Sequence, residues 1–233
     1  MIFLKFTKFP QVRYGFSSQQ DGSMHRHLEK TNRERYFSDI GIRPEQVITA
    51  DLVHGNHVTF VSGEDSGKMI AATDGLITNE KNLFLSITTA DCYPVYFYDP
   101  VQKCIGIAHA GWRGTLGNII QETVEALIGN FKTKPSDLRV GIGPAIRKCH
   151  FEISRGDKGK YENYPECISE KQGKVFVDLA GIIKFQLLRD GVIEEHIEDC
   201  GLCTYCETGN CFSYRRDQPK EIQPMIGYIG LMR

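Results

Sequence analysis

The stretch PVYFYDPVQKCIGIAHA, residues 94–110, predicts two β-strands joined by a short turn. Its first part is aromatic and β-branched, and its second part, from Cys104 to Ala110, is an apolar run. Between them Asp99 precedes Pro100, a pair that initiates turns because proline fixes φ and the aspartate side chain can bond to the following backbone. The connection is short enough for an antiparallel hairpin, so the two strands are expected to pair directly.

Further strand patterns precede and follow this hairpin, and helical patterns lie between and after them. Strands are predicted at 46–53, 57–61, 75–79, 83–89, 94–99, 104–110 and 138–143. Helices are predicted at 31–39, 115–130 and 177–190. The polar run from Ser154 to Lys174 is rich in turn-forming residues and predicts a long surface loop or insertion. This mixture indicates an α+β fold or a mixed-sheet α/β layer fold.

Composition places the chain among ordinary globular proteins. It has 233 residues, of which 41% are hydrophobic and 24% charged, and a formal net charge of -1. These values predict one domain over residues 1–233 and give no sign of nucleic-acid binding. The apolar start is too short for a signal peptide, and no run approaches the ~20 apolar residues of a membrane span. We therefore expect a cytoplasmic protein whose eight cysteines stay reduced and serve as ligands, nucleophiles or core residues.

Cys92 and His109 are predicted to meet across the hairpin. If Pro100 and Val101 form its tip, these residues lie opposite each other with Cβ atoms about 4.5–5.5 Å apart. A register shift of one residue would place them on opposite faces. His54 follows an apolar run and could supply a third ligand from a strand end.

A cysteine and two histidines fit more than one kind of centre. They could hold a zinc ion with one open position, or a copper ion with a weak axial group. Zinc is favoured because no axial methionine is evident. Without a metal, Cys92 and His109 would form a thiol nucleophile and its base.

The residues after His109 indicate how an anion would bind. The chain turns through Gly111 and Gly114 into the helix predicted at 115–130, whose N-terminal amides would attract an anion, and Arg113 lies beside them. Trp112, the only tryptophan, could stack on a planar base or pack in the core. The sequence therefore predicts a phosphate or similar anion beside the metal.

Six motifs, in order from about residue 14 to 217, resemble those of the bacterial laccase-domain family, long called multicopper polyphenol oxidoreductases: LVHGNHV, TDGLITN, TTADCYPVYFYDP, IGIAHAGWRGT, GIGPAIRKCHFEI and GLCTYCETGNCFSYRRD. The resemblance implies a layered α/β/β/α fold with a mixed central sheet, related to cysteine hydrolases. It also implies one zinc ion held by His54, Cys92 and His109. Copper stays the alternative metal, but a multicopper centre needs more histidines than the seven present.

The same resemblance implies purine nucleoside chemistry, because family members phosphorolyse adenosine, inosine and methylthioadenosine and some deaminate adenosine. Other members are described as peptidoglycan editing factors, which remove a wrongly added serine from a muropeptide precursor. In a nucleoside enzyme, zinc would act as a Lewis acid. Asp74 would serve as a general base or orient a zinc ligand, and Tyr93, Trp112 and Phe16 would flank the purine.

Two other hypotheses compete with this one. Cys200, Cys203, Cys206 and Cys211 could form a four-cysteine metal knot in a zinc-stabilised binding module, although their spacing does not match the separated pairs of a zinc ribbon. A metal-independent hydrolase would instead use Cys92 activated by His109. The basic pair Arg215 and Arg216 is predicted to be a solvated turn or a salt bridge rather than an anion site.

Overall fold

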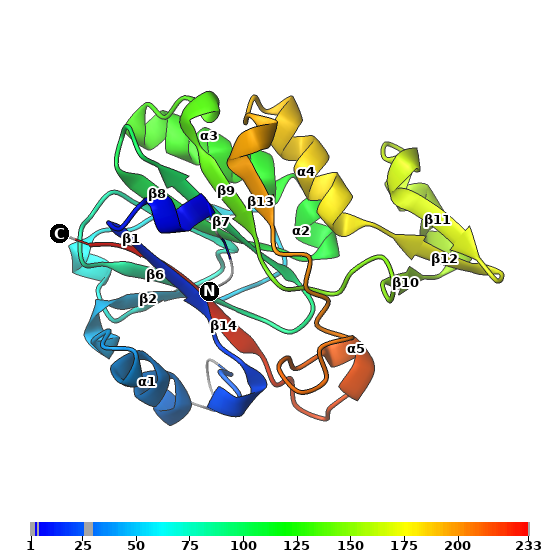
Figure 1. Ribbon diagram of the computed structural model, residues 1–233, viewed down its shortest axis with the longest axis horizontal. Helices are drawn as coiled ribbons and strands as arrows, with labels where there is room; N and C mark the ends of the chain where they lie inside the picture. Colours follow the sequence, from blue (N-terminus) through cyan, green and yellow to red (C-terminus); the bar gives the residue numbers. More distant parts are fainter. Residues whose placement is uncertain (1–2, 4, 26–29, 233) are drawn as a thin grey trace.

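Residues 3, 5–25 and 30–232, which the computed structural model describes, form two large β-sheets that lie face to face between helices (Figure 1). The six-stranded sheet has the order β13 (Ile197–Asp199), β9 (Arg139–Ile142), β7 (Tyr93–Asp99), β8 (Cys104–Ala110), β5 (Gly75–Thr78) and β3 (Val58–Phe60). The five-stranded sheet has the order β1 (Val12–Phe16), β14 (Met225–Leu231), β6 (Phe84–Thr89), β2 (Val47–Ala50) and β4 (Met69–Ile70). Both sheets mix parallel and antiparallel pairs.

Strands β7 and β8 are buried along their whole length because both faces of their sheet are covered. Successive side chains of a strand point to opposite faces. Val95 and Phe97 therefore pack with the helices, whereas Tyr96 and Tyr98 pack against the five-stranded sheet. This arrangement gives the hairpin two separate apolar cores, one on each face.

Helices form the two outer layers. Helices α2 (Trp112–Leu116), α3 (Ile119–Phe131) and α4 (Leu179–Arg189) lie over the six-stranded sheet, and α1 (Lys30–Asp39) lies over the five-stranded sheet (Figure 1). The short helix α5 (Tyr214–Asp217) follows β13 in a segment that is otherwise without regular structure. The described residues thus form the α/β/β/α layers implied by the sequence resemblance.

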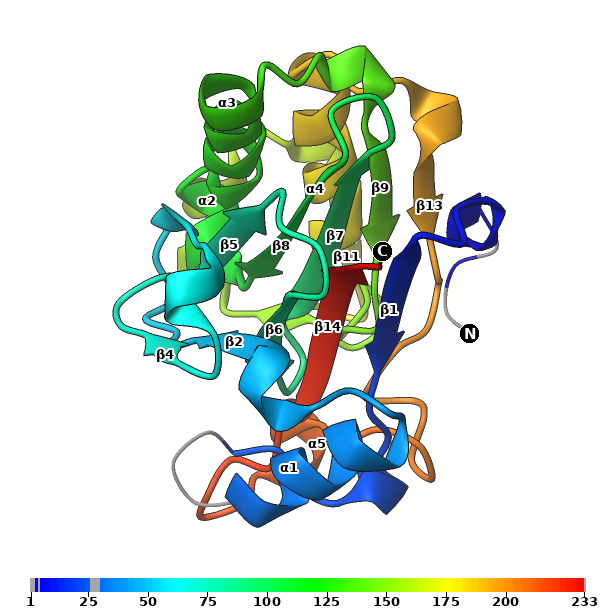
Figure 2. The same ribbon diagram turned by 90° about the vertical axis from the view of Figure 1, so that its left-hand side faces the viewer.

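The last strand of the chain is an inner strand of its sheet. Strand β14 lies between β1 and β6 and pairs antiparallel with both, as Figure 2 shows. All seven of its residues are buried. The five-stranded sheet is therefore assembled from segments at opposite ends of the sequence.

The predicted elements agree with the observed ones where apolar patterns were strong. Each of the seven predicted strands overlaps an observed strand, and the helices predicted at 31–39 and 177–190 correspond to α1 and α4. The single helix predicted at 115–130 is wrong, because the chain breaks at Gly117 and Asn118 and forms α2 and α3 instead. Asn118 has a left-handed φ of 65° that no helix interior accepts.

The surface loop predicted from Ser154 to Lys174 is only partly right. This run contains two 3₁₀ turns, and strands β11 (Ile168–Lys171) and β12 (Lys174–Val177) form a hairpin that pairs with β10 (Glu152–Ile153). The hairpin turns at Gln172 and Gly173, both with positive φ, as a two-residue turn requires. Apolar periodicity did not reveal β11 because its residues are mostly exposed.

No helix among the described residues is both long enough and apolar enough to cross a membrane.

Candidate functional site

Three of the predicted ligands converge where the inner strands β7 and β8 meet at one end of the six-stranded sheet. His109 lies in β8, Cys92 directly precedes β7, and His54 lies in the loop after β2. One donor atom of each side chain lies within 4.8 Å of the others, and the two imidazole rings are 4.8 Å apart at an angle of 86°. These residues therefore come together as the sequence predicted.

The register of the hairpin differs from the prediction. Its turn has four residues, so His109 pairs with Pro94 instead of Cys92. The error is a shift of two residues, and side chains two apart in a strand lie on the same face. Cys92 consequently stays on the same side as His109, although the assumed opposition was wrong.

Backbone strain accompanies two positions at the site. His54 has φ 60° and Asp91, the residue before Cys92, has φ 87°. Residues other than glycine seldom adopt this region, and such conformations persist where the surroundings enforce them. Hydrogen bonds to its carboxylate stabilise the strained conformation of Asp91. The donors are Thr204 Oγ1 at 2.6 Å, Ser213 Oγ at 3.1 Å and the backbone N–H of Arg215 at 2.7 Å.

Asp74 forms hydrogen bonds with two of the candidate ligand residues, on the side away from the metal position. Its carboxylate is fully buried and accepts a hydrogen bond from His109 Nδ1 at 2.9 Å. It also accepts from the backbone N–H groups of His54 at 2.9 Å and Gly55 at 2.7 Å. With Nδ1 engaged in this way, Nε2 is the atom that His109 presents to a metal.

The charges of the site favour a thiolate. Desolvation alone would raise the pKa of Cys92, but the charge of His109 and hydrogen bonds to both imidazoles outweigh it and lower the pKa to about 6. Desolvation would lower the pKa of His109, but Cys92 and Asp74 raise it to about 9. The pKa of Asp74 is lowered despite burial by its bond to His109 and its backbone hydrogen bonds. A thiolate is the form of cysteine that binds metals and acts as a nucleophile.

The donor set fits a single metal ion. One sulfur and two imidazole nitrogens form a ligand group typical of catalytic zinc, in which the fourth position is left for water or substrate. Gly111 provides the clearance, because a Cβ atom there would lie 2.9 Å from Cys92 Sγ and 3.4 Å from His54 Cδ2. His54, Cys92 and His109 are thus suited to hold the zinc ion that the resemblance implies.

A cavity of about 310 Å³ opens over these three residues, at the small end of ligand pockets. Of the predicted substrate-binding residues, Gly111, Trp112 and Arg113 line it. The Arg113 guanidinium lies 4.5 Å from the centre of the Trp112 ring, and the Lys160 ammonium lies 4.9 Å from it. The cavity therefore combines an aromatic surface with positive charge beside the candidate ligands.

Two residues predicted to flank a purine do not line this cavity. Tyr93 is fully buried, and its hydroxyl donates to the carbonyl oxygen of Ile146 at 2.8 Å. Phe16 packs against Cys211 and Phe212 in a small apolar cluster. Both rings pack in apolar clusters instead.

The residues of the cavity wall that sequence reasoning did not assign to the site include Phe151, Tyr214 and Arg215. The Arg215 guanidinium lies 5.5 Å from the Phe151 ring, and its Nη1 donates to the carbonyl oxygen of Glu152 at 2.7 Å. Arg215 is exposed, as a solvated residue would be, and it also lines the cavity, a role that the sequence analysis did not assign to it. The pair was adjacent in sequence, but only the fold separates their roles.

Arg216 has the structural role that was predicted for the pair. Its guanidinium pairs with Asp217 at 2.6 Å and donates to the carbonyl oxygens of Thr204 and Cys211, both at 2.8 Å. These bonds hold the segment between β13 and α5 in place.

The four-cysteine knot that was considered as a competing hypothesis does not form among the described residues. Cys200 and Cys211 lie outside the group of possible metal ligands that contains Cys203 and Cys206. That group is completed by Cys149 and His150, from the loop after β9. Short spacing suggested a local knot, whereas the fold brings in partners from a distant segment.

Comparisons with known proteins agree with this architecture. A family model described as multi-copper polyphenol oxidoreductase laccase matches residues 16–232. Purine nucleoside phosphorylase YlmD of Bacillus subtilis (strain 168) is 34% identical over 212 residues, which cover 86% of this chain and 76% of that protein.

Solved structures also resemble this chain closely. The crystal structure of YlmD from Geobacillus stearothermophilus has a TM-score of 0.90 at 30% identity and covers 97% of this chain and 93% of that chain. The crystal structure of Bacillus licheniformis hypothetical protein YfiH has a TM-score of 0.89 at 32% identity and covers 95% and 93%. Because the family match extends over nearly the whole sequence, the chain belongs to the multi-copper polyphenol oxidoreductase laccase family.

Proposed function

We propose that this chain is a zinc-dependent purine nucleoside phosphorylase that acts on adenosine, inosine and methylthioadenosine. The observation that carries the proposal is the convergence of His54, Cys92 and His109 at the base of a cavity lined by aromatic residues and arginines. The name of the Bacillus subtilis relative supports the same reaction class. Deamination of adenosine is a secondary activity that the same centre could perform with water as the nucleophile.

The wall of the cavity offers groups for both substrates. Trp112, Phe151 and Tyr214 present aromatic surface on which a purine can stack. Arg113 and Arg215 present guanidinium groups, which bind phosphate oxygens through paired hydrogen bonds. We assign the aromatic residues to the base and the two arginines to phosphate.

Phosphorolysis needs a positioned nucleophile and a stabilised leaving group. A phosphate oxygen forms a bond to the anomeric carbon of the ribose while the bond from that carbon to the purine nitrogen breaks. The electron pair leaves with the purine, which takes up the proton that phosphate gives up. A bound zinc ion would supply Lewis-acid stabilisation of negative charge, and the arginines hold the phosphate in line for attack.

Asp74 acts here as a positioning residue and not as a general base. Both of its oxygens accept hydrogen bonds, and its side chain is fully buried behind His109. Its contacts instead fix the imidazole of His109 and the backbone of His54. A carboxylate behind a ligand histidine is a common device for orienting the ring and raising its basicity.

A second candidate function uses the same residues without a metal. Asp74, His109 and Cys92 follow one another as carboxylate, imidazole and thiol, the order of a cysteine hydrolase triad. Such a centre would cleave an amide, as in muropeptide editing. Activity that survives chelation and is destroyed by thiol alkylation would favour this alternative.

Incubation of the zinc-loaded protein with adenosine, with and without phosphate, tests the proposal directly. The expected products with phosphate are adenine and ribose 1-phosphate in equal amounts, identified by chromatography and mass spectrometry. Adenosine should stay intact or yield only inosine when phosphate is omitted. Adenine formed equally well without phosphate would show hydrolysis and contradict the proposal.

Replacing either arginine of the cavity should weaken phosphate binding selectively. Arg113→Ala and Arg215→Ala are each expected to raise the KM for phosphate about 10–100-fold, because a charge-assisted hydrogen bond contributes about 1.5–3 kcal/mol. The KM for the nucleoside should change much less. Steady-state kinetics with each substrate varied in turn measure both constants, and Arg43→Ala, an exposed arginine outside the cavity, is the matched control. An unchanged phosphate KM in both variants would remove these residues from the anion site.

A further inference from the structure

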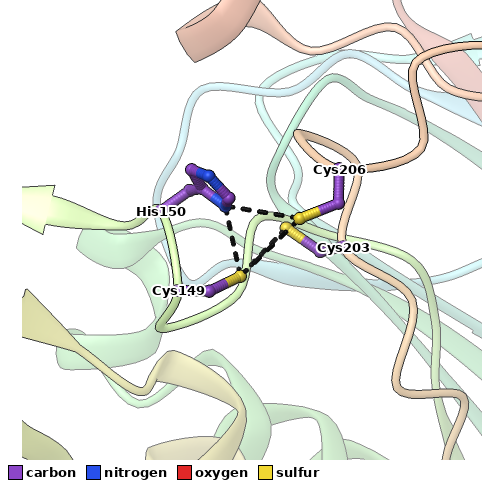
Figure 3. A group of neighbouring side chains, drawn as sticks. All are labelled: Cys149, His150, Cys203 and Cys206. Carbon is purple, nitrogen blue, oxygen red and sulfur yellow. Dashed lines mark hydrogen bonds between the residues drawn. The ribbon is translucent and has the colours of Figure 1, made fainter.

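A second group of metal-binding side chains lies apart from the proposed catalytic residues. Cys149 and His150 come from the loop between β9 and β10, and Cys203 and Cys206 come from the segment between β13 and α5. The four side chains point toward one another across this junction, as Figure 3 shows. Their donor atoms all lie within 4.8 Å of one another.

The distances within this group match a tetrahedral site. Zinc–sulfur and zinc–nitrogen bonds of about 2.3 and 2.0 Å at tetrahedral angles place sulfurs about 3.8 Å apart and a sulfur and a nitrogen about 3.5 Å apart. Cys149 Sγ lies 3.6 Å from Cys203 Sγ and 3.9 Å from Cys206 Sγ. His150 Nδ1 lies 3.2 Å from Cys149 Sγ and 3.4 Å from Cys206 Sγ.

We propose that Cys149, His150, Cys203 and Cys206 form a structural zinc site. Three thiolates and an imidazole are a common ligand set of structural zinc, and the Cys-x₂-Cys spacing of Cys203 and Cys206 is typical of such sites. A redox pair would need only two of these cysteines, whereas here a third sulfur and a ring nitrogen converge on the same point. With four protein ligands the site is closed, so its role is structural.

Contacts around the group hold the ligands in place. The backbone N–H of Arg147 donates to Cys203 Sγ at 3.5 Å, a bond that favours the thiolate. The Tyr205 ring stacks on His150 with centroids 4.0 Å apart and an angle of 13°, which fixes the plane of the imidazole. The ligands are therefore preorganised by neighbours from both segments.

The site joins two segments that form one wall of the catalytic cavity. Phe151 follows His150, and Ile146 lies in the same loop, while Tyr214 and Arg215 begin α5, directly after the other segment; all four line the cavity. Thr204, next to Cys203, donates to the carboxylate of Asp91, the residue before Cys92. A zinc ion bound here would link the two segments and so stabilise this wall of the cavity without contacting the substrate.

Counting zinc in matched variants tests the site independently of activity. The purified, reduced protein is loaded with zinc chloride, desalted and analysed by mass spectrometry for metals. We expect two zinc ions per chain in the wild type, and one in Cys149→Ser and in Cys206→Ser. Both cysteines are exposed, so these variants are expected to fold. Cys200→Ser, a half-buried cysteine outside the group, should keep both ions.

The outcomes separate this site from the proposed catalytic one. Cys92→Ala should retain the zinc ion bound by Cys149 and Cys206, whatever becomes of the enzymatic activity. Hydrogen exchange should be faster at residues 204–217 in Cys206→Ser than in Cys200→Ser. Zinc content that is the same in the wild type, Cys149→Ser and Cys206→Ser would overturn the proposal, as would a group that binds iron in preference to zinc.

Discussion

Cys92→Ala is expected to lower kcat/KM for adenosine phosphorolysis about 100-fold or more and to remove the metal held with His54 and His109. Substitution of a residue that hydrogen-bonds to a metal ligand lowers metal affinity or activity about 10–100-fold. Loss of a ligand itself should have a larger effect. The two imidazoles alone leave the ion without its only thiolate. Kinetics and metal analysis on the same preparation measure both effects.

Two controls make this result specific. Cys200→Ala removes a half-buried thiol elsewhere and should leave activity unchanged. Wild-type protein should lose phosphorolysis after chelation and regain it when zinc is restored. If Cys92→Ala keeps full activity, the assigned centre is not the catalytic one; if activity survives chelation, the metal-free thiol mechanism is favoured instead.

Asp74→Ala should destabilise the fold by about 3–5 kcal/mol, the range observed when one partner of a buried pair is removed. The change leaves the buried N–H group of His109 and the backbone N–H groups after β2 without their acceptor. Urea unfolding measures the loss as a lower midpoint. Asp39→Ala, an exposed carboxylate on α1, should stay within about 0.5 kcal/mol of the wild type.

The contribution of Asp74 should depend on pH with a defined sign. Its pKa is lowered in the folded protein, so the stabilisation is present above the ordinary carboxyl pKa of 3.8 and is lost as the pH falls through the lowered value. The difference in the free energy of unfolding between wild type and Asp74→Asn should therefore be largest at neutral pH and become smaller only in strong acid. A difference that grows on acidification would contradict this assignment.

The sequence predicted the candidate ligands better than it predicted the geometry that joins them. The hairpin was recognisable because β7 and β8 are apolar throughout and are interrupted by Asp99 and Pro100. Its register was not, because a two-residue tip and a four-residue turn are both compatible with that sequence. Cys92 and His109 still lie together because the error was an even number of residues.

Residues that reach the cavity from distant segments could not be identified from local patterns. Arg215 and Arg216 have the same chemistry and adjacent positions, yet one lines the cavity and the other binds backbone carbonyls. The cysteines of the proposed structural zinc site could not be grouped from local spacing either. Spacing paired Cys203 with Cys200 and Cys211, whereas its observed neighbours Cys149 and His150 arrive through the parallel pairing of β13 with β9.

The inner position of β14 sets the order in which the molecule can be completed during synthesis. Strands β1 and β6 leave the ribosome long before residues 225–231, yet in the finished sheet each of them hydrogen-bonds to that strand and not to the other. Until it emerges, the nascent chain exposes two unpaired strand edges, which are templates for association with other chains. Closure of this sheet therefore waits until residues 225–231 have been synthesised and have paired with both strands.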